Sequence, residues 1–150
     1  MSDNHINDNT EFEVSSEQSQ VDFHFKATAE AAAQARRQFR HILDNWCPNC
    51  SATRDELLLA VGEAISNACR HGCGGKPLPI HVSASWDAKD REVTVEVHDP
   101  GSGFDYPLFM RRTHADEDYS CGLFLMVNSA DSVSYERRDN SFVCTIKKRL

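Results

Sequence analysis

Two runs of alternating apolar residues, joined by a short polar turn, constrain the fold of this 150-residue chain more than any other feature. Residues 80–84 read Ile-His-Val-Ser-Ala, and residues 93–97 read Val-Thr-Val-Glu-Val. A period of two puts successive apolar side chains on one face of a strand. Residues 87–90, Asp-Ala-Lys-Asp, supply a turn between the runs. The pattern predicts an antiparallel hairpin with one buried face.

Two amphipathic helices are predicted before this hairpin. The first covers about residues 28–46 and ends before Pro48, which disfavours helix at the residue preceding it. Thr53 and Glu56 form a T-x-x-E pattern that is typical of a capping box at a helix start. The second helix is therefore expected to begin near Thr53 and to end at Gly72.

The remaining segments complete a recognisable order of elements. A period of two predicts a first strand at residues 21–26 and two closing strands near residues 133–137 and 142–147. Residues 99–120 lack a regular period and are expected to form a long loop, followed by a short helix at residues 123–127. Helices that gather on one face of a mixed, mostly antiparallel sheet make an α+β, two-layer sandwich.

The charge is concentrated at the N-terminus. The formal net charge is −7, and residues 1–20 hold five acidic side chains and no Lys or Arg. Such a polar segment buries too little apolar surface to offset its ordering entropy. We therefore expect residues 1–20 to be a flexible acidic tail and residues 21–150 to be one domain. The acidic balance argues against direct nucleic-acid binding, which needs a basic surface.

The apolar residues indicate no membrane association. The sequence has no run of about 18 apolar residues of the kind that spans a bilayer. Its N-terminus also lacks the basic-then-apolar pattern of a secretory signal. A cytoplasmic protein is expected.

Cysteine is frequent, at Cys47, Cys50, Cys69, Cys73, Cys121 and Cys144. C-x2-C followed by C-x3-C is a spacing also found in zinc sites. However, Cys50 and Cys69 lie at opposite ends of the second predicted helix, more than ~20 Å apart, and one zinc ion holds all its thiolates at about 2.3 Å. Without a secretory context, the sequence favours reduced and mostly buried thiols.

Glu63, Asn67 and His71 are spaced four residues apart on the second predicted helix. This spacing places them in one line along a helix face. A carboxylate one turn from an amide suits a site where the carboxylate accepts a proton and the amide oxygen binds a hard cation. Taken alone, the same line is also typical of a solvated polar face.

Two glycine-containing segments suit nucleotide binding. Asp99 ends the valine-rich strand, where its carboxylate can accept a hydrogen bond from an exocyclic amine, and Gly101 and Gly103 allow close approach of the backbone. Gly122 precedes an apolar helix start at Leu123, where free N–H groups and the helix dipole favour a phosphate. An ordinary Asp-Pro-Gly turn and a plain helix entry remain the alternatives.

Together, the patterns E-x-x-x-N, D-x-G-x-G and G-L, in this order, resemble the N, G1 and G2 boxes of the GHKL (Bergerat-fold) ATPase superfamily. Residues 63–72, Glu-Ala-Ile-Ser-Asn-Ala-Cys-Arg-His-Gly, are most similar to the anti-sigma-factor serine/threonine protein kinases. The resemblance covers about residues 21–150. It implies the Bergerat ATP-binding fold with ATP or ADP and Mg²⁺ as cofactors.

The resemblance also implies a role for each site residue. Glu63 would be the catalytic base, Asn67 the Mg²⁺ ligand and Asp99 the partner of the adenine amine. Residues 104–121 would form a lid over ATP. The further nucleotide contacts would be His71, Gly101, Gly103, Arg111, Arg112, Gly122 and Leu123.

The implied function is an ATP-dependent serine/threonine kinase that acts as an anti-sigma factor. Such a protein phosphorylates an anti-anti-sigma (STAS-type) antagonist, sequesters a sigma factor and forms a homodimer. One alternative is a nucleotide-binding, partner-switching module without kinase activity, favoured by Ser120, where the family commonly has glycine. Another is the ATP-binding half of a histidine kinase. Against it, residues 1–20 are not expected to form a dimerisation helix pair with a phospho-acceptor histidine.

Overall fold

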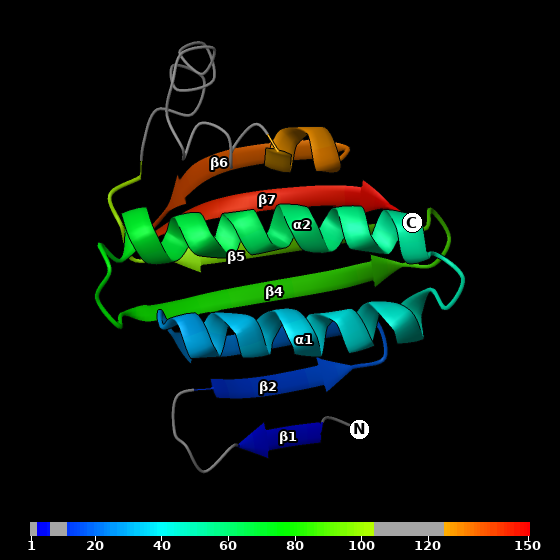
Figure 1. The fold of residues 1–150 in the computed structure, drawn as a ribbon, viewed down its shortest axis with the longest axis horizontal. Coiled ribbons are helices and arrows are strands. Elements are labelled where there is room, and N and C mark those ends of the chain that lie inside the picture. The colour runs from blue at the N-terminus through cyan, green and yellow to red at the C-terminus, as the bar shows by residue number, and fades with distance from the viewer. Residues whose placement is uncertain (1–2, 7–11, 104–124) are drawn as a thin grey trace.

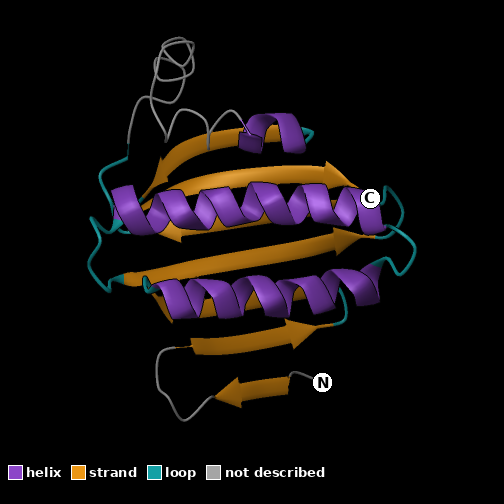
Figure 2. Cartoon of the chain, viewed as in Figure 1, coloured by secondary structure: helices purple, strands orange, loops and turns teal. Residues whose placement is uncertain are grey.

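Among the residues that the structure describes, seven antiparallel strands form one sheet, and two long helices cover one of its faces (Figures 1 and 2). The computed structural model describes residues 3–6, 12–103 and 125–150. The elements are β1 (Asp3–Ile6), β2 (Phe12–Glu17), β3 (Gln20–Lys26), α1 (Ala29–Trp46), α2 (Ser51–Asn67), the π-helix η1 (Ala68–Gly72), β4 (Pro79–Asp87), β5 (Glu92–Asp99), β6 (Ser132–Arg138) and β7 (Ser141–Arg149). Residues 125–129 are also helical. No helix among these residues is long and apolar enough to cross a membrane.

The strand order confirms the expected fold class. The strands lie in the order β1-β2-β3-β4-β5-β7-β6, and every described pair is antiparallel, so the sheet is not mixed. Both helices occur between β3 and β4, which are neighbours in the sheet. The molecule is the α+β, two-layer sandwich that the sequence predicts, with the helices on one face (Figure 2).

Periodicity determines which side chains fill the space between the two layers. The three valines of β5 are at most 1% exposed, whereas the residues between them are partly exposed. In α1 the buried residues recur at each turn from Ala31 to Leu43. Phe39 of this helix meets Phe23 of β3 edge to face, with ring centroids 6.3 Å apart. Helix period and strand period thus point at the same core.

The start of α2 differs from the predicted capping box. The helix begins at Ser51, and Cys50 is its N-cap. The Thr53 hydroxyl donates a hydrogen bond to the carbonyl of Cys50 (3.3 Å) instead of accepting one from the backbone. Glu56 pairs with the ammonium of Lys148 on β7. Tertiary pairing with the sheet has therefore replaced the local capping interaction.

The end of α2 also differs. The α-helical hydrogen bonding stops at Asn67, and the chain continues to Gly72 as a π-helix. The Cys73 N–H donates to the carbonyl of Ala68, five residues earlier, at 2.9 Å. Single π turns inside helices are frequent at functional sites.

The N-terminal segment is not the expected flexible tail, because residues 3–6 and 12–17 form β1 and β2. β2 pairs along its length with β3. Phe12 is 5% exposed, and its ring lies 5.8 Å from those of Phe23 and Phe25. The composition of this segment is misleading because β3 supplies both the hydrogen-bond partners and the apolar surface that the segment lacks.

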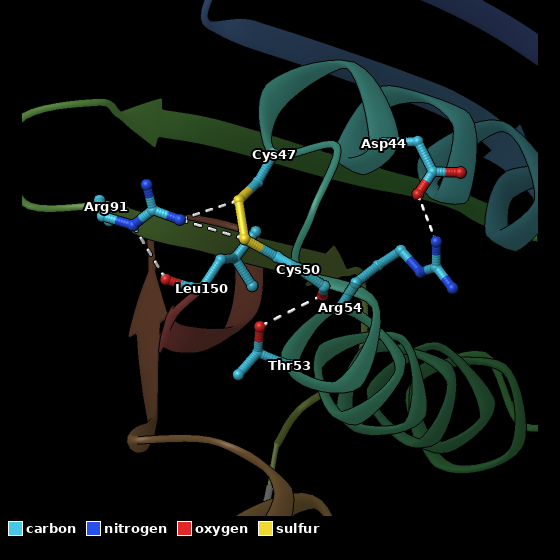
Figure 3. The surroundings of a disulfide bond; sticks show 7 residues. All are labelled: Asp44, Cys47, Cys50, Thr53, Arg54, Arg91 and Leu150. Atoms are coloured by element: carbon cyan, nitrogen blue, oxygen red, sulfur yellow. Dashed lines mark hydrogen bonds and ion pairs between the residues drawn. A yellow bond between two sulfur atoms is a disulfide. The ribbon is translucent and has the colours of Figure 1, made fainter.

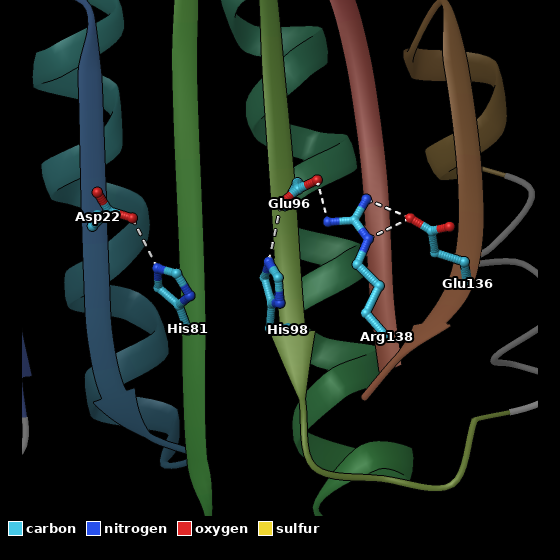
Figure 4. Close-up of polar contacts among 6 residues, drawn as sticks. All are labelled: Asp22, His81, Glu96, His98, Glu136 and Arg138. Carbon is cyan, nitrogen blue, oxygen red and sulfur yellow. Dashed lines mark hydrogen bonds and ion pairs between the residues drawn. The ribbon is translucent and has the colours of Figure 1, made fainter. Parts of the chain in front are cut away.

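The sheet face away from the helices carries polar side chains (Figure 4). His81 bonds Asp22 at 2.8 Å across β3 and β4, and His98 bonds Glu96 at 3.1 Å on β5. Glu96 also accepts a hydrogen bond from Arg138 at 2.8 Å. These pairs provide hydrogen-bond partners for polar side chains that alternate along the strands with the buried apolar ones.

The cysteines correct one expectation. The turn between α1 and α2 brings the Cα atoms of Cys47 and Cys50 to 5.6 Å, and a disulfide joins them. The thiols of Cys69, Cys73 and Cys144 are free, and the last two are buried. Burial raises the pKa of Cys73 to about 11 and that of Cys144 to about 12, so both stay protonated at neutral pH.

The docking of β2 can be tested with Phe12→Ala. Removing this buried ring should lower the free energy of unfolding by about 3–5 kcal/mol, as for other core Phe→Ala changes. Glu13→Ala, at the exposed neighbouring position, is the control and should change it by no more than about 0.5 kcal/mol. Urea unfolding measures both. Equal stability of the two variants would mean that the segment is not packed on the sheet.

Candidate functional site

The C-terminal ends of α2 and β5 meet at one end of the sheet (Figure 1). There, Gly72 packs so closely on Asp99 that a Cβ atom at Gly72 would lie 2.3 Å from the carboxylate carbon. A Cβ at Gly101 would lie 2.7 Å from the Cα of Gly72. Both contacts therefore require glycine. We call the cluster of Asn67, Gly72, Asp99 and Gly101 the α2–β5 junction.

The carboxylate of Asp99 is held rigidly and largely without water. The side chain is 8% exposed, and the Gly101 N–H donates to its Oδ1 at 2.8 Å. Burial raises the pKa of Asp99, although the hydrogen bond from Gly101 and the charges of Arg137 and His98 act in the opposite direction. A dehydrated, oriented acceptor of this kind suits a ligand that brings its own N–H donor.

Asn67 is a second buried polar group, and its hydrogen bonding is incomplete. It is 8% exposed, and within the described part of the chain its Oδ1 accepts no hydrogen bond. Buried polar atoms without a partner are rare and call for an explanation. An amide oxygen is a ligand that Mg²⁺ accepts. The orphaned Oδ1 therefore fits the metal-ligand role that was expected for Asn67.

Glu63 precedes Asn67 by one turn of α2 and is half-buried. The four-residue spacing within regular helix places both side chains on one face, as expected. His71 follows Asn67 by four residues within the π turn, and it is exposed where Asn67 is buried.

The glycine-rich segment after β5 is close to β7. Gly103 has a φ of +81°, and a Cβ there would lie 2.6 Å from the ring of Phe142. This position thus requires glycine on two grounds, backbone conformation and packing. Four other residues expected at the nucleotide lie outside the described residues: Arg111, Arg112, Gly122 and Leu123. Ser120 and the whole of the expected lid, 104–121, lie outside them as well.

Arg137 contacts the junction, and the sequence did not predict this contact. The guanidinium of Arg137 on β6 donates to the carbonyl of Gly101 at 3.0 Å, and its charge lowers the pKa of Asp99. The sheet register explains this contact, because Arg137 lies opposite Phe142, which in turn lies opposite Asp99. Nothing in the local sequence around Arg137 signals this pairing.

Comparison with known proteins identifies relatives. The family model of the histidine kinase-like ATPase domain matches residues 25–148. The anti-sigma F factor of Clostridium acetobutylicum is 29% identical over 101 residues, which span 63% of this chain and 68% of that protein. The crystal structure of the RsbU and RsbW domains of Rv1364c from Mycobacterium tuberculosis superposes with a TM-score of 0.60 at 19% identity. The superposition covers 86% of the present chain but only 32% of the Mycobacterium tuberculosis chain. At 19% identity, this likeness concerns the fold alone.

The environment of Asp99 predicts how stability changes with pH. Because burial raises the pKa of the folded state, the contribution of Asp99 to stability is complete below its unfolded pKa of about 3.9 and falls as the pH rises through the folded value. Asp99→Asn keeps the acceptor for Gly101 without the charge. In the absence of ligands it should melt above the wild type at pH 7–8, and the two curves should converge towards pH 4.

Melting curves of both proteins between pH 4 and 8 provide the measurement. Asp90→Asn, which removes one charge from the exposed β4–β5 turn, is the matched control. A variant at Asp99 that is less stable than the wild type at every pH would refute a burial cost at this carboxylate.

Proposed function

Because the chain belongs to the family of histidine kinase-like ATPase domains, we propose that it binds ATP with Mg²⁺ at the α2–β5 junction and phosphorylates serine or threonine in a partner protein. One observation carries this proposal: Asn67, one helical turn after Glu63 on α2, has a buried Oδ1 with no hydrogen-bond partner among the described residues. Phosphoryl transfer needs a metal ligand close to a general base, and Asn67 and Glu63 can supply these two groups.

The adenine end of the nucleotide is assigned to Asp99. Its carboxylate accepts a hydrogen bond from the exocyclic amine, and the Gly101 N–H keeps Oδ1 in a fixed position for that contact. Because Gly72 and Gly101 have no side chains, there is room for the carboxylate of Asp99. A Cβ atom at either position would occupy that space. Arg137 ties the Gly101 backbone to β6 and holds this segment in place.

The phosphate end is assigned to α2. Asn67 offers its amide oxygen to Mg²⁺, and Glu63 accepts the proton of the attacking hydroxyl on a carboxylate oxygen. The metal, when bound, neutralises negative charge on the phosphates and so lowers the barrier to phosphoryl transfer. The half-buried position of Glu63 supports this role, because a base must reach both the site and an incoming protein.

The identity of the partners rests on likeness to a relative. The Clostridium acetobutylicum protein is an anti-sigma F factor. By that likeness, we infer that the present chain is an anti-sigma factor that sequesters a sigma factor. The homodimer and the STAS-type anti-anti-sigma substrate are proposed from the resemblance of residues 63–72 to the anti-sigma-factor kinases. The second candidate is a nucleotide-dependent switch that sequesters its partner without phosphorylating it, for which Ser120 in the third box is the specific reason.

Nucleotide binding should raise thermal stability. A ligand at a hundred times its dissociation constant adds about 2.7 kcal/mol, or roughly 5–10 °C in melting temperature for a chain of this size. Asp99→Asn should lose most of the shift given by Mg-ADP, whereas Asp90→Asn should keep it. Differential scanning fluorimetry measures all three proteins. A full shift in the Asp99 variant would place adenine elsewhere.

Glu63 and Asn67 should fail in different ways. Glu63→Gln keeps size and hydrogen bonding but removes the base, so it should bind Mg-ATP normally and phosphorylate about 10²–10⁴-fold more slowly. Asn67→Ala removes the metal ligand and should weaken nucleotide binding in Mg²⁺ but not in EDTA. The assay uses radiolabelled ATP and a purified STAS-domain protein from the same genome, with isothermal titration for affinity.

Glu30→Gln, at an exposed position of α1, controls for the loss of a carboxylate and should behave as the wild type. Wild-type phosphorylation by Glu63→Gln would eliminate Glu63 as the base. If the wild type binds Mg-ATP and the partner but transfers no phosphate, the sequestering switch is the correct function.

A further inference from the structure

The Cys47–Cys50 disulfide lies in the turn between α1 and α2, at the end of the sheet opposite the α2–β5 junction (Figures 1 and 3). Three parts of the chain that are distant in sequence meet there. Arg91, from the β4–β5 turn, bonds through its Nε to the carbonyl of Leu150, and the Leu150 N–H bonds back to the carbonyl of Arg91. The C-terminal end of β7 therefore holds Arg91 next to the disulfide.

Arg91 contacts both sulfur atoms. Its NH2 group lies 3.1 Å from the Sγ of Cys47 and 3.1 Å from the Sγ of Cys50. A guanidinium beside a sulfur stabilises the thiolate relative to the thiol. Cys50 has a second stabilising element, because it is the N-cap of α2 and so lies at the positive end of the helix dipole.

The two sulfurs differ in access. Cys47 is 6% exposed, whereas Cys50 is only half-buried. An external thiol therefore reaches Cys50 and not Cys47. The three remaining cysteines among the described residues have no comparable setting: Cys69, Cys73 and Cys144 are not paired, and burial raises the pKa of each.

We propose that Cys47 and Cys50 form a thiol–disulfide exchange site for low-molecular-weight thiols, in which Cys50 reacts with the external sulfur, Cys47 is the leaving and resolving sulfur, and Arg91 stabilises the thiolate of each. The site is separate from the nucleotide site and does not depend on the proposed kinase function.

The exchange balances in two steps. An external thiolate attacks the Sγ of Cys50, the Cys47–Cys50 bond breaks, and Cys47 leaves as a thiolate beside Arg91. A second external thiolate attacks the external sulfur of the mixed disulfide and releases Cys50 as a thiolate. Two external thiols are oxidised to one disulfide, the protein disulfide is reduced to two thiols, and the protons lost by the external thiols are taken up by the protein.

The roles of the two cysteines can be tested with glutathione. Oxidised wild type, incubated with reduced glutathione and then trapped with iodoacetamide, should show Cys47 and Cys50 alkylated together, and oxidised glutathione should restore the bond. With oxidised glutathione, Cys47→Ser should form a mixed disulfide at Cys50 at least about tenfold faster than Cys50→Ser forms one at Cys47, because access limits exchange. Peptide mass spectrometry identifies the modified residue.

Testing the role of Arg91 requires a substitute residue that can adopt the positive φ of this position. Arg91 has a φ of +54°, a region that Asn adopts readily, so Arg91→Asn removes the guanidinium with little backbone cost. Reduction by glutathione at pH 7 should become roughly three- to tenfold slower, and Arg91→Lys should recover part of the rate. Arg149→Gln removes an exposed positive charge from the neighbouring strand and should leave the rate unchanged.

Three results would overturn the proposal. The first is a bond that glutathione does not reduce while the protein still melts cooperatively, which would make it purely structural. The second is a preference for adducts at Cys47. The third is an equal rate of reduction in wild type and Arg91→Asn. If that variant does not fold, an unchanged rate in Arg91→Gly, which also removes the charge and tolerates the positive φ, counts in the same way.

Discussion

The contact between Gly72 and the carboxylate of Asp99 is the constraint on which the rest of the site depends. It joins the end of the α2–η1 helix to the end of β5, and a Cβ at Gly72 would lie 2.3 Å from the carboxylate carbon. The contact lies where Asp99 is 8% exposed, and Asn67 on the same helix is also 8% exposed. Most of the other chemistry of the junction, including the Gly101 hydrogen bond and the field of Arg137, follows from the position of that carboxylate.

The sequence predicted those parts of the fold that depend on periodicity. The alternation of apolar and polar residues in β4 and β5 and the apolar stripe of α1 were sufficient to predict the α+β class. At the start of α1, the Thr28 hydroxyl oxygen accepts a hydrogen bond from the Ala31 N–H, as a helix cap should. The N-terminal strands were missed because local composition does not reveal that β3 is available for pairing. The capping box failed because Thr53 and Glu56 found partners outside the local motif.

The same distinction applies to the site. Glu63, Asn67 and Asp99 were proposed as site residues because their spacing in the sequence resembles the boxes of a known superfamily. Arg137 was not, since its contact depends on the register of three strands. The π turn that contains His71 was not predicted, because a single sequence gives no sign of it. The disulfide was excluded by a compartment argument, although the turn brings its Cα atoms within bonding range.

The central claim is that metal and nucleotide bind at the α2–β5 junction, with Asn67 as a metal ligand. Mn²⁺ takes the same oxygen ligands as Mg²⁺ and broadens nearby NMR signals, so a titration of ¹⁵N-labelled protein with Mn²⁺ and ADP locates the metal directly. The account predicts selective loss of the Asn67 side-chain amide and of backbone amides in residues 66–72, while the backbone amides of Cys47, Asn49 and Cys50 remain. Broadening centred elsewhere, or no selective broadening in the presence of ADP, would contradict it.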